Sequence, residues 1–220
     1  MKTGRLTAII ERNLPSSPDE KREYVGASSI GSPCLRQIYY SYHNHNRAKN
    51  TVREQRIFDI GKILEGMIIQ SIKDAGLNIV TPHPSNHHLQ FFDAELEYFR
   101  GHADGLLVDW NALLEIKTMN NASWNKFVKQ GLQLSHGIYY SQVQSYMGMS
   151  GIQKTYAIGL NKDKATFHDE EIPYNDDHYQ KLRIKAKAIH SATTEPPKIH
   201  TNPSFYLCKM CKFNKECHGQ

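Results

Sequence analysis

Residues 101 to 117, GHADGLLVDWNALLEIK, constrain the fold more than any other stretch of this chain. Their alternating apolar positions and the Trp-Asn pair predict neighbouring β-strands joined by a turn. Asp104 lies in the first strand-like run, and Glu115 and Lys117 stand two residues apart in the second. Because side chains alternate along a strand, Glu115 and Lys117 share one face. Two carboxylates that hold a divalent cation, with an ammonium beside them, are what hydrolysis of a phosphodiester needs.

Apolar periodicity on either side of this stretch predicts a mixed α/β fold. A helix over 57–74 precedes three strands, and two helices, two strands and a long basic helix follow them. The expected strands are 89–92, 96–109, 112–119, 155–160 and 166–172, and the remaining expected helices are 28–48, 121–134, 136–150 and 174–193.

Two of the expected helices carry polar residues beside their apolar stripes. Gln142 and Tyr146 are four positions apart, so they lie on one face of the helix over 136–150. Tyr146 is either a core residue or a site residue. Glu65 lies beside the apolar stripe of the helix over 57–74. Glu65 is either a solvated helix residue or a semi-buried carboxylate, which needs a partner.

The four cysteines are Cys34 and a C-terminal C-x2-C-x5-C formed by Cys208, Cys211 and Cys217. Four thiolates suit an iron–sulfur cluster or a tetrahedral zinc ion. The N-terminal residues contain only a short apolar run, which predicts no secretory signal and a cytoplasmic location. In that reducing compartment we expect a metal site rather than disulfides.

The motif core resembles that of the PD-(D/E)XK nuclease superfamily. Asp104, followed by Glu115-x-Lys117, is similar to the superfamily's catalytic carboxylates and lysine. Gln142 and Tyr146 resemble the Gln-x-x-x-Tyr motif of its RecB-like branch. The resemblance implies the restriction-endonuclease-like αβββαβ core, and the expected order of helices and strands agrees with it.

The cysteines resemble those of the iron–sulfur members of the RecB-like branch. These are the AddB nuclease domain and the CRISPR-adaptation nucleases, and SPCLRQIYY around Cys34 is similar to their first cluster segment. The resemblance runs from about residue 26 to the C-terminus and implies a small, standalone, phage-type member. It implies a [4Fe–4S] cluster, with zinc as the second choice, whose ligands are Cys34, Cys208, Cys211 and Cys217.

The resemblance also implies a metal-dependent DNA exonuclease. The ligands it implies for Mg²⁺ or Mn²⁺ are Asp104, Glu115, the backbone carbonyl of Ile116 and, as a further carboxylate, Glu65. Lys117 would orient the attacking water, and Gln142 would position the phosphate or Lys117, with Tyr146 behind it. The branch acts most often on DNA ends, frequently single-stranded, in DNA processing or recombination.

Basic residues are concentrated toward the C-terminus. The formal net charge is +5, and from residue 181 onward eight Lys or Arg residues accompany two acidic ones. This excess favours a polyanionic partner such as DNA. The residues expected to contact DNA are Arg36, Tyr39, Lys181 and Lys185. The alternatives are a solvated helix face for the lysines and core packing for the tyrosine.

We expect residues 1–25 to be a partly disordered segment and residues 26–220 to be a single nuclease domain. The catalytic core would span about 57–172, with cluster elements at 28–48 and 196–220. No apolar run approaches the length of about 18 residues that a membrane span needs.

Two other functions stay open at this point. The first is an endonuclease of the same superfamily. The second is a non-catalytic nucleic-acid-binding protein, in which the metal site is structural and the acidic pair is incidental. The sequence contains no G-x-x-x-x-G-K-[ST] motif, so unwinding would need a helicase or recombination protein as a partner.

Overall fold

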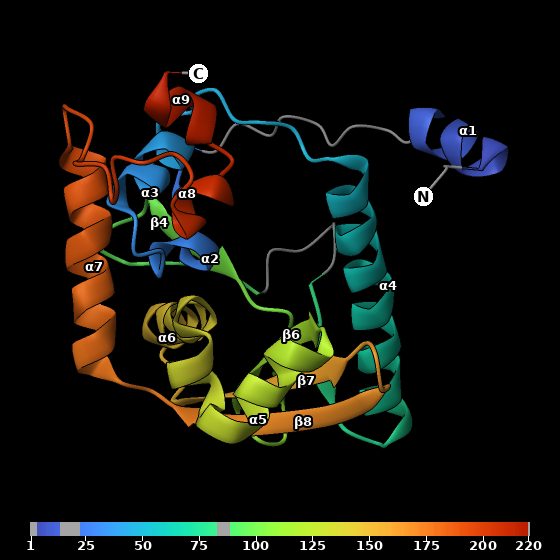
Figure 1. Ribbon diagram of the computed structural model, residues 1–220. Coiled ribbons are helices and arrows are strands. Elements are labelled where there is room, and N and C mark those ends of the chain that lie inside the picture. The colour runs from blue at the N-terminus through green and yellow to red at the C-terminus, as the bar shows by residue number, and fades with distance from the viewer. Residues whose placement is uncertain (1–3, 14–22, 83–88, 220) are drawn as a thin grey trace.

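The larger of two sheets has five strands in the order β2-β5-β6-β7-β8 and lies in the lower part of Figure 1. It is seen in a computed structural model, which describes residues 4–13, 23–82 and 89–219. β6 and β7 are parallel, and the other neighbouring strands are antiparallel. The strands are β2 (Ile79–Val80), β5 (Gly105–Leu107), β6 (Ala112–Met119), β7 (Lys154–Asn161) and β8 (Thr166–Pro173).

Helices cover both faces of this sheet, because β6 is apolar on both. α4 lies along one face, where its Ile68 packs with Leu114 and Ile116. α5 and α6 lie on the other face, the side of Leu113 (Figure 1). These helices are α4 (Val52–Asp74), α5 (Asn121–Ser135) and α6 (Gly137–Ser150).

The helix predicted over 57–74 begins five residues earlier than expected, at Val52. A capping box starts it: the Thr51 hydroxyl accepts from the Glu54 N–H (3.3 Å), and the Glu54 carboxylate accepts from the Thr51 N–H (2.7 Å). The Glu54 carboxylate also accepts from Lys212 Nζ at 2.6 Å. The start of α4 is thereby joined to the cysteine-containing tail.

The single strand predicted over 96–109 is wrong, because the chain changes sheets within it. The N–H of Ala103 donates to the Leu89 carbonyl (3.1 Å), whereas the N–H of Asp104 donates to the Leu114 carbonyl (3.2 Å). The first half therefore joins a second sheet of order β1-β4-β3, and the second half is β5. The strands of the second sheet are β1 (Val25–Gly26), β3 (Gln90–Phe92) and β4 (Phe99–His102).

The helix predicted over 28–48 is also wrong in extent. The structure has two short helices there, α2 (Ala27–Ile30) and α3 (Leu35–Tyr42). Pro33 separates them, because it lacks an N–H and disfavours the helical conformation in the residue before it. After α3 the chain leaves the helix, and Asn44 adopts a positive φ of 54°.

The N-terminal segment contains a helix, α1 (Arg5–Asn13), where the sequence predicted partial disorder. Residues 1–3 and 14–22 of that segment lie outside the described residues. The remaining helices are α7 (Asp176–Ser191), α8 (Tyr206–Lys209) and α9 (Asn214–His218), and the last two lie beside α3 (Figure 1). None of the helices within the described ranges has both the length and the apolar character that crossing a bilayer requires.

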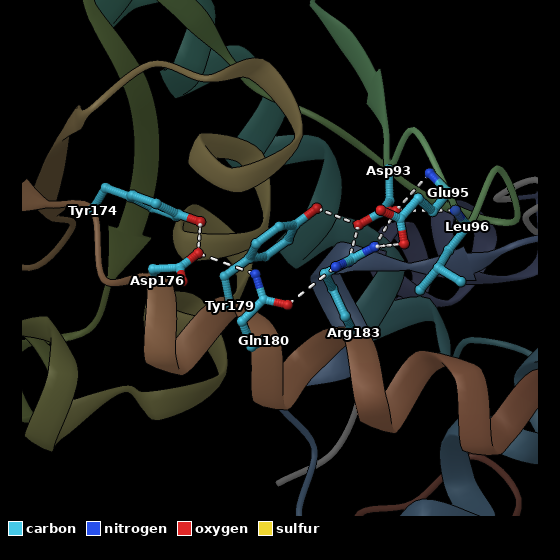
Figure 2. Close-up of polar contacts among 8 residues, drawn as sticks. All are labelled: Asp93, Glu95, Leu96, Tyr174, Asp176, Tyr179, Gln180 and Arg183. Carbon is cyan, nitrogen blue, oxygen red and sulfur yellow. Dashed lines mark hydrogen bonds and ion pairs between the residues drawn. The ribbon is translucent and has the colours of Figure 1, made fainter.

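A buried carboxylate ties α7 to the turn after β3 (Figure 2). Asp93 accepts hydrogen bonds from the Tyr179 hydroxyl (2.6 Å) and from Arg183 Nε (2.7 Å). The backbone N–H groups of Glu95 and Leu96 donate to its other oxygen, both at 3.0 Å. Burial opposes the charged form of Asp93, but these hydrogen bonds outweigh it and hold the pKa of Asp93 below its usual value.

Replacing Asp93 by alanine is expected to reduce the free energy of unfolding by about 3 kcal/mol at neutral pH, because Arg183 and Tyr179 lose a buried partner. The lowered pKa sets the sign of the pH dependence. Stability from Asp93 is complete above its unfolded-state pKa, about 3.9, and is lost as the pH falls through the lower folded-state pKa.

Urea unfolding of the wild type and of Asp93→Ala at neutral and acidic pH measures both effects. The difference between the two proteins should shrink as the pH falls. Asp177→Ala is the control, since Asp177 is exposed in the first turn of the same helix, and it should change stability little. Equal unfolding free energies for wild type and Asp93→Ala at neutral pH would contradict the assigned role of Asp93.

Candidate active site

The change of sheet places Asp104 beside the middle of β6. The pairing of β5 with β6 reaches Gly105 and Leu114. Beyond that pair, the Asp104 carboxylate accepts a hydrogen bond from the Ile116 N–H at 2.7 Å. The carboxylate thus replaces a backbone carbonyl as the partner of this edge of β6.

Glu115 and Lys117 contact each other on one side of β6. Glu115 is fully buried, and its Oε1 accepts a short hydrogen bond from Lys117 Nζ. The other carboxylate oxygen, Oε2, is buried and has no hydrogen-bond partner. An unpaired carboxylate oxygen in a dry site is costly, so its position requires a compensating group.

The site has too little positive charge for its carboxylates. Burial, followed by the charge of Asp104, raises the pKa of Glu115 to about 8, although Lys117 opposes the shift. Burial also raises the pKa of Asp104. Burial lowers the pKa of Lys117, but the two carboxylates outweigh it and raise that pKa above its usual value. The Lys117 ammonium is therefore the positive charge that acts on both Asp104 and Glu115.

A third carboxylate, that of Glu65 on α4, lies near enough to Asp104 and Glu115 for their charges to interact. It is half-buried, and its pKa is raised first by burial and then by the charge of Asp104. Glu65 in turn adds to the raised pKa of Glu115. The structure thus favours the semi-buried alternative for Glu65 over the solvated one.

Gln142 and Tyr146 are both buried on α6, behind the carboxylates. Gln142 Nε2 donates to the Tyr146 hydroxyl at 2.6 Å. Burial, with the charge of Glu115 next, raises the pKa of Tyr146 well above its usual value. The ring of Tyr146 lies against the backbone of Gly101, where an added Cβ would stand 2.4 Å from it. Tyr146 is therefore a core residue that also borders the site.

The sequence interpretation missed Tyr139. Its ring centroid lies 5.0 Å from Lys117 Nζ, which puts the ammonium in cation–π contact. Tyr139 precedes Gln142 by about one helical turn, so both face the same side of α6. The signal available in the sequence was this spacing within HGIYYSQVQSY.

The carboxylates fit a divalent cation by donor type and by charge. Carboxylate and carbonyl oxygens are the ligands that Mg²⁺ and Mn²⁺ prefer. Within residues 4–13, 23–82 and 89–219, no three His, Cys, Asp or Glu side chains converge closely enough to form a metal site. The orphaned oxygen of Glu115 and the raised carboxyl pKa values nevertheless mark a deficit of positive charge that such a cation would fill.

The four cysteines lie around a second place, remote from Asp104 in the fold, although within the described residues no three of them come close enough to form a metal site. They line one cavity between α3 and the C-terminal helices, together with His200 and His218. All four thiols are free. Burial, then the neighbouring thiols of Cys34 and Cys217, raises the pKa of Cys208. His218 Nε2 is buried and has no hydrogen-bond partner, so donors that suit a soft metal face this cavity.

Contacts within the protein engage three of the four residues expected to bind DNA. Arg36 Nε donates to the Pro196 carbonyl at 2.6 Å, and its guanidinium pairs with Glu195. Lys185 Nζ donates to the Ser32 carbonyl at 2.5 Å. The Arg36 contacts hold α3 against the segment that follows α7, and the Lys185 contact holds α7 against the turn before α3.

Tyr39, the third of these residues, is buried, and its ring centroid lies 4.1 Å from that of His43. Core packing, rather than stacking on bases, is therefore its role. Lys181, on α7, is exposed and stays a proposed DNA contact.

No protein-family model matches this sequence, and no curated protein has significant sequence similarity to it. Solved structures do resemble it. An alkaline exonuclease from Laribacter hongkongensis has a TM-score of 0.58 at 17% identity, over 78% of this chain and 88% of that one. A phage-related exonuclease from Haemophilus somnus 129PT has a TM-score of 0.55 at 14% identity, over 76% of this chain and 91% of that one.

A third structure, that of SSO0001, has a TM-score of 0.51 at 18% identity and covers 96% of this chain and 95% of its own. At such identities the likeness establishes the fold. The predicted α/β fold is confirmed, because its helices and mixed sheets resemble those of solved exonucleases.

Proposed function

We propose that this chain is a divalent-metal-dependent deoxyribonuclease that hydrolyses phosphodiester bonds from DNA ends. The observation that carries the proposal is that Asp104 and the Glu115–Lys117 pair lie at neighbouring positions along β6, and one buried oxygen of Glu115 has no partner. Such a site balances the charge that develops on a phosphate during hydrolysis. The fold shared with solved exonucleases supports the same class of reaction.

Each site residue would have a separate role in hydrolysis. The groups that would hold Mg²⁺ or Mn²⁺ are Asp104, Glu115, the Ile116 carbonyl and Glu65. When bound, the metal would supply Lewis acidity and a water of lowered pKa. Lys117 would orient the water and neutralise charge on the phosphate. Gln142 would position the phosphate or Lys117, with its amide held by the Tyr146 hydroxyl.

We assign DNA with a free end as the substrate, with a preference for single strands, in DNA processing or recombination. Exonucleases are among the proteins of similar fold, and the Laribacter alkaline exonuclease has also been solved with dAMP. A helicase or recombination protein would supply any unwinding. Lys181 would contact the DNA backbone, because its exposed ammonium can pair with phosphates.

We also propose that the cysteine cavity holds a [4Fe–4S] cluster, as in the iron–sulfur members of the RecB-like branch. The support is that Cys34, Cys208, Cys211 and Cys217 line one cavity although they come from opposite ends of the chain. Zinc is the alternative cofactor, and His218 would then be a candidate ligand. In either case the cofactor would join the two ends of the domain and take no part in hydrolysis.

Digestion of end-labelled linear DNA by anaerobically purified protein tests the proposed function. Single- and double-stranded substrates should be shortened from their ends in Mn²⁺ or Mg²⁺, and chelation by EDTA should stop the reaction. Cleavage of closed circular DNA would favour an endonuclease. DNA binding without cleavage under any metal condition would favour the non-catalytic alternative.

The same assay tests Glu65. Glu65→Gln should raise the Mg²⁺ concentration needed for half-maximal activity without lowering the melting temperature, because the exchanged group is a cation ligand. Glu97→Gln, at an exposed position, is the matched control. An unchanged Mg²⁺ requirement in Glu65→Gln would remove Glu65 from the ligand set.

A further inference from the structure

His136 lies at the junction between α5 and α6, and both of its ring nitrogens are engaged. Nε2 lies 2.6 Å from the Ser123 hydroxyl oxygen, and Nδ1 lies 2.7 Å from that of Ser135. Burial, with the charge of Lys126 second, lowers the pKa of His136. The lowered pKa favours the neutral ring, in which one nitrogen donates and the other accepts. These two contacts fix the orientation of the imidazole.

Tyr139 stacks on this fixed ring. The two ring centroids are 5.5 Å apart, and their planes make an angle of only 6°. Tyr139 is also the aromatic ring that lies 5.0 Å from the Lys117 ammonium. A continuous set of contacts thus runs from the serines of α5 through His136 and Tyr139 to the Lys117 side chain.

We propose that Tyr139 is a positioning residue that holds the Lys117 ammonium in place for hydrolysis. This proposal rests on the nuclease function proposed above. The structure describes two contacts of Lys117 Nζ, one with the Glu115 carboxylate and one with the face of the Tyr139 ring. A lysine side chain has a long flexible stem, so one partner alone does not select a single rotamer.

The ring contact of Lys117 does not depend on the negative charge of Glu115. Glu115 would have to share its negative charge with a divalent cation in the site, and its attraction for the ammonium would fall. The Tyr139 ring has no negative charge to share, and it stacks on His136 at the junction between α5 and α6. Because the contact uses the ring face, the tyrosine hydroxyl is not needed for it.

Steady-state kinetics on end-labelled DNA test the proposal. Tyr139→Leu should lower kcat about tenfold with little change in KM, because substrate binding is retained while Lys117 is misplaced. Tyr139→Phe keeps the ring face and should restore nearly wild-type kcat. Tyr156→Leu is the matched control, since the Tyr156 ring on β7 lies 5.8 Å from Lys154 Nζ, a lysine outside the site, and the variant should behave as wild type.

A second measurement does not depend on activity. In protein with ¹³C-labelled lysine, the methylene signals of Lys117 can be identified by their loss in Lys117→Arg. The ring should shift them upfield in the wild type and in Tyr139→Phe, and they should move downfield in Tyr139→Leu.

The positioning role would be overturned by a wild-type kcat in Tyr139→Leu, or by Lys117 methylene signals whose chemical shifts are the same in Tyr139→Leu and in the wild type. A loss in Tyr139→Phe as large as that in Tyr139→Leu would overturn it as well. A wild-type protein that cleaves no DNA, although its Lys117 signals respond to Tyr139→Leu, would overturn the proposed function and with it the catalytic purpose of the contact.

Discussion

Replacing Asp104 by asparagine is expected to abolish metal-dependent DNA cleavage while the protein stays folded. The asparagine oxygen can still accept the hydrogen bond that Ile116 N–H donates to Asp104 at 2.7 Å, so the bend between β4 and β5 keeps its anchor. The negative charge that would hold the cation is lost. Removal of such stabilisation lowers reaction rates on the order of 10²-fold or more.

Replacing Lys117 by alanine should reduce the cleavage rate as strongly, because it removes the ammonium rather than a proposed metal ligand. Without the ammonium, Glu115 lies buried beside Asp104 with no positive neighbour. Burial and the charge of Asp104 already raise the pKa of Glu115, and loss of the ammonium favours its protonated form further, so the variant avoids an unpaired buried charge. The variant should therefore fold and bind DNA but lack the ammonium that is proposed to face the reacting phosphate.

Initial rates on end-labelled DNA in Mg²⁺ and in Mn²⁺, together with thermal melts, check both substitutions. Asp109→Asn is the matched control, because Asp109 is exposed in the same hairpin. It should cleave at the wild-type rate. Wild-type rates in either Asp104→Asn or Lys117→Ala would place the reaction elsewhere in the molecule.

Local rules made the centre of the site predictable from the sequence. The strand expected over 112–119 has the same bounds in the structure, and alternation along it brings Glu115 and Lys117 into contact. Gln142 and Tyr146 hydrogen-bond because residues four apart are neighbours on a helix. These relationships depend on the type of element and its period, and both were readable without knowledge of the tertiary structure.

Features that depend on packing between distant segments could not be predicted in this way. The apolar pattern continues through residues 96–109. The backbone nevertheless changes hydrogen-bond partners between Ala103 and Asp104, because the first half of the run pairs with one sheet and the second half with the other. Gly101 was the available signal, since it leaves room for the Tyr146 ring from α6. Tyr139 likewise meets Lys117 only after α6 has packed on β6.

Charge alone also failed to identify the residues that face the solvent. Arg36 and Lys185 are cations in a basic region, as a DNA-binding surface would require. Each nevertheless donates to a carbonyl of the protein, that of Pro196 and that of Ser32 respectively. A backbone carbonyl and a phosphate oxygen are both acceptors for such groups, so sequence does not distinguish an internal clamp from a binding site.

Replacing Cys34 by serine is expected to remove the proposed cofactor and to lower the melting temperature by about 10–20 °C. Cys34 and the three tail cysteines bracket nearly the whole described domain, yet they line one cavity. A link that closes a loop of ~100 residues or more stabilises by about 5 kcal/mol in the chain-entropy model. For a chain of this size, each kcal/mol changes the melting temperature by about 2–4 °C.

Metal and acid-labile sulfide analysis of anaerobically purified protein identifies the cofactor, and thermal melts measure its contribution to stability. Iron with about equal sulfide indicates the [4Fe–4S] cluster, whereas zinc without sulfide changes the cofactor but keeps the link. Chelation should lower the melting temperature of the wild type to that of Cys34→Ser and should lower that of the variant no further, because both treatments remove one link. Wild-type protein that contains no metal and melts together with Cys34→Ser would contradict the link, and the contacts of Arg36 and Lys185 would then hold the two ends together on their own.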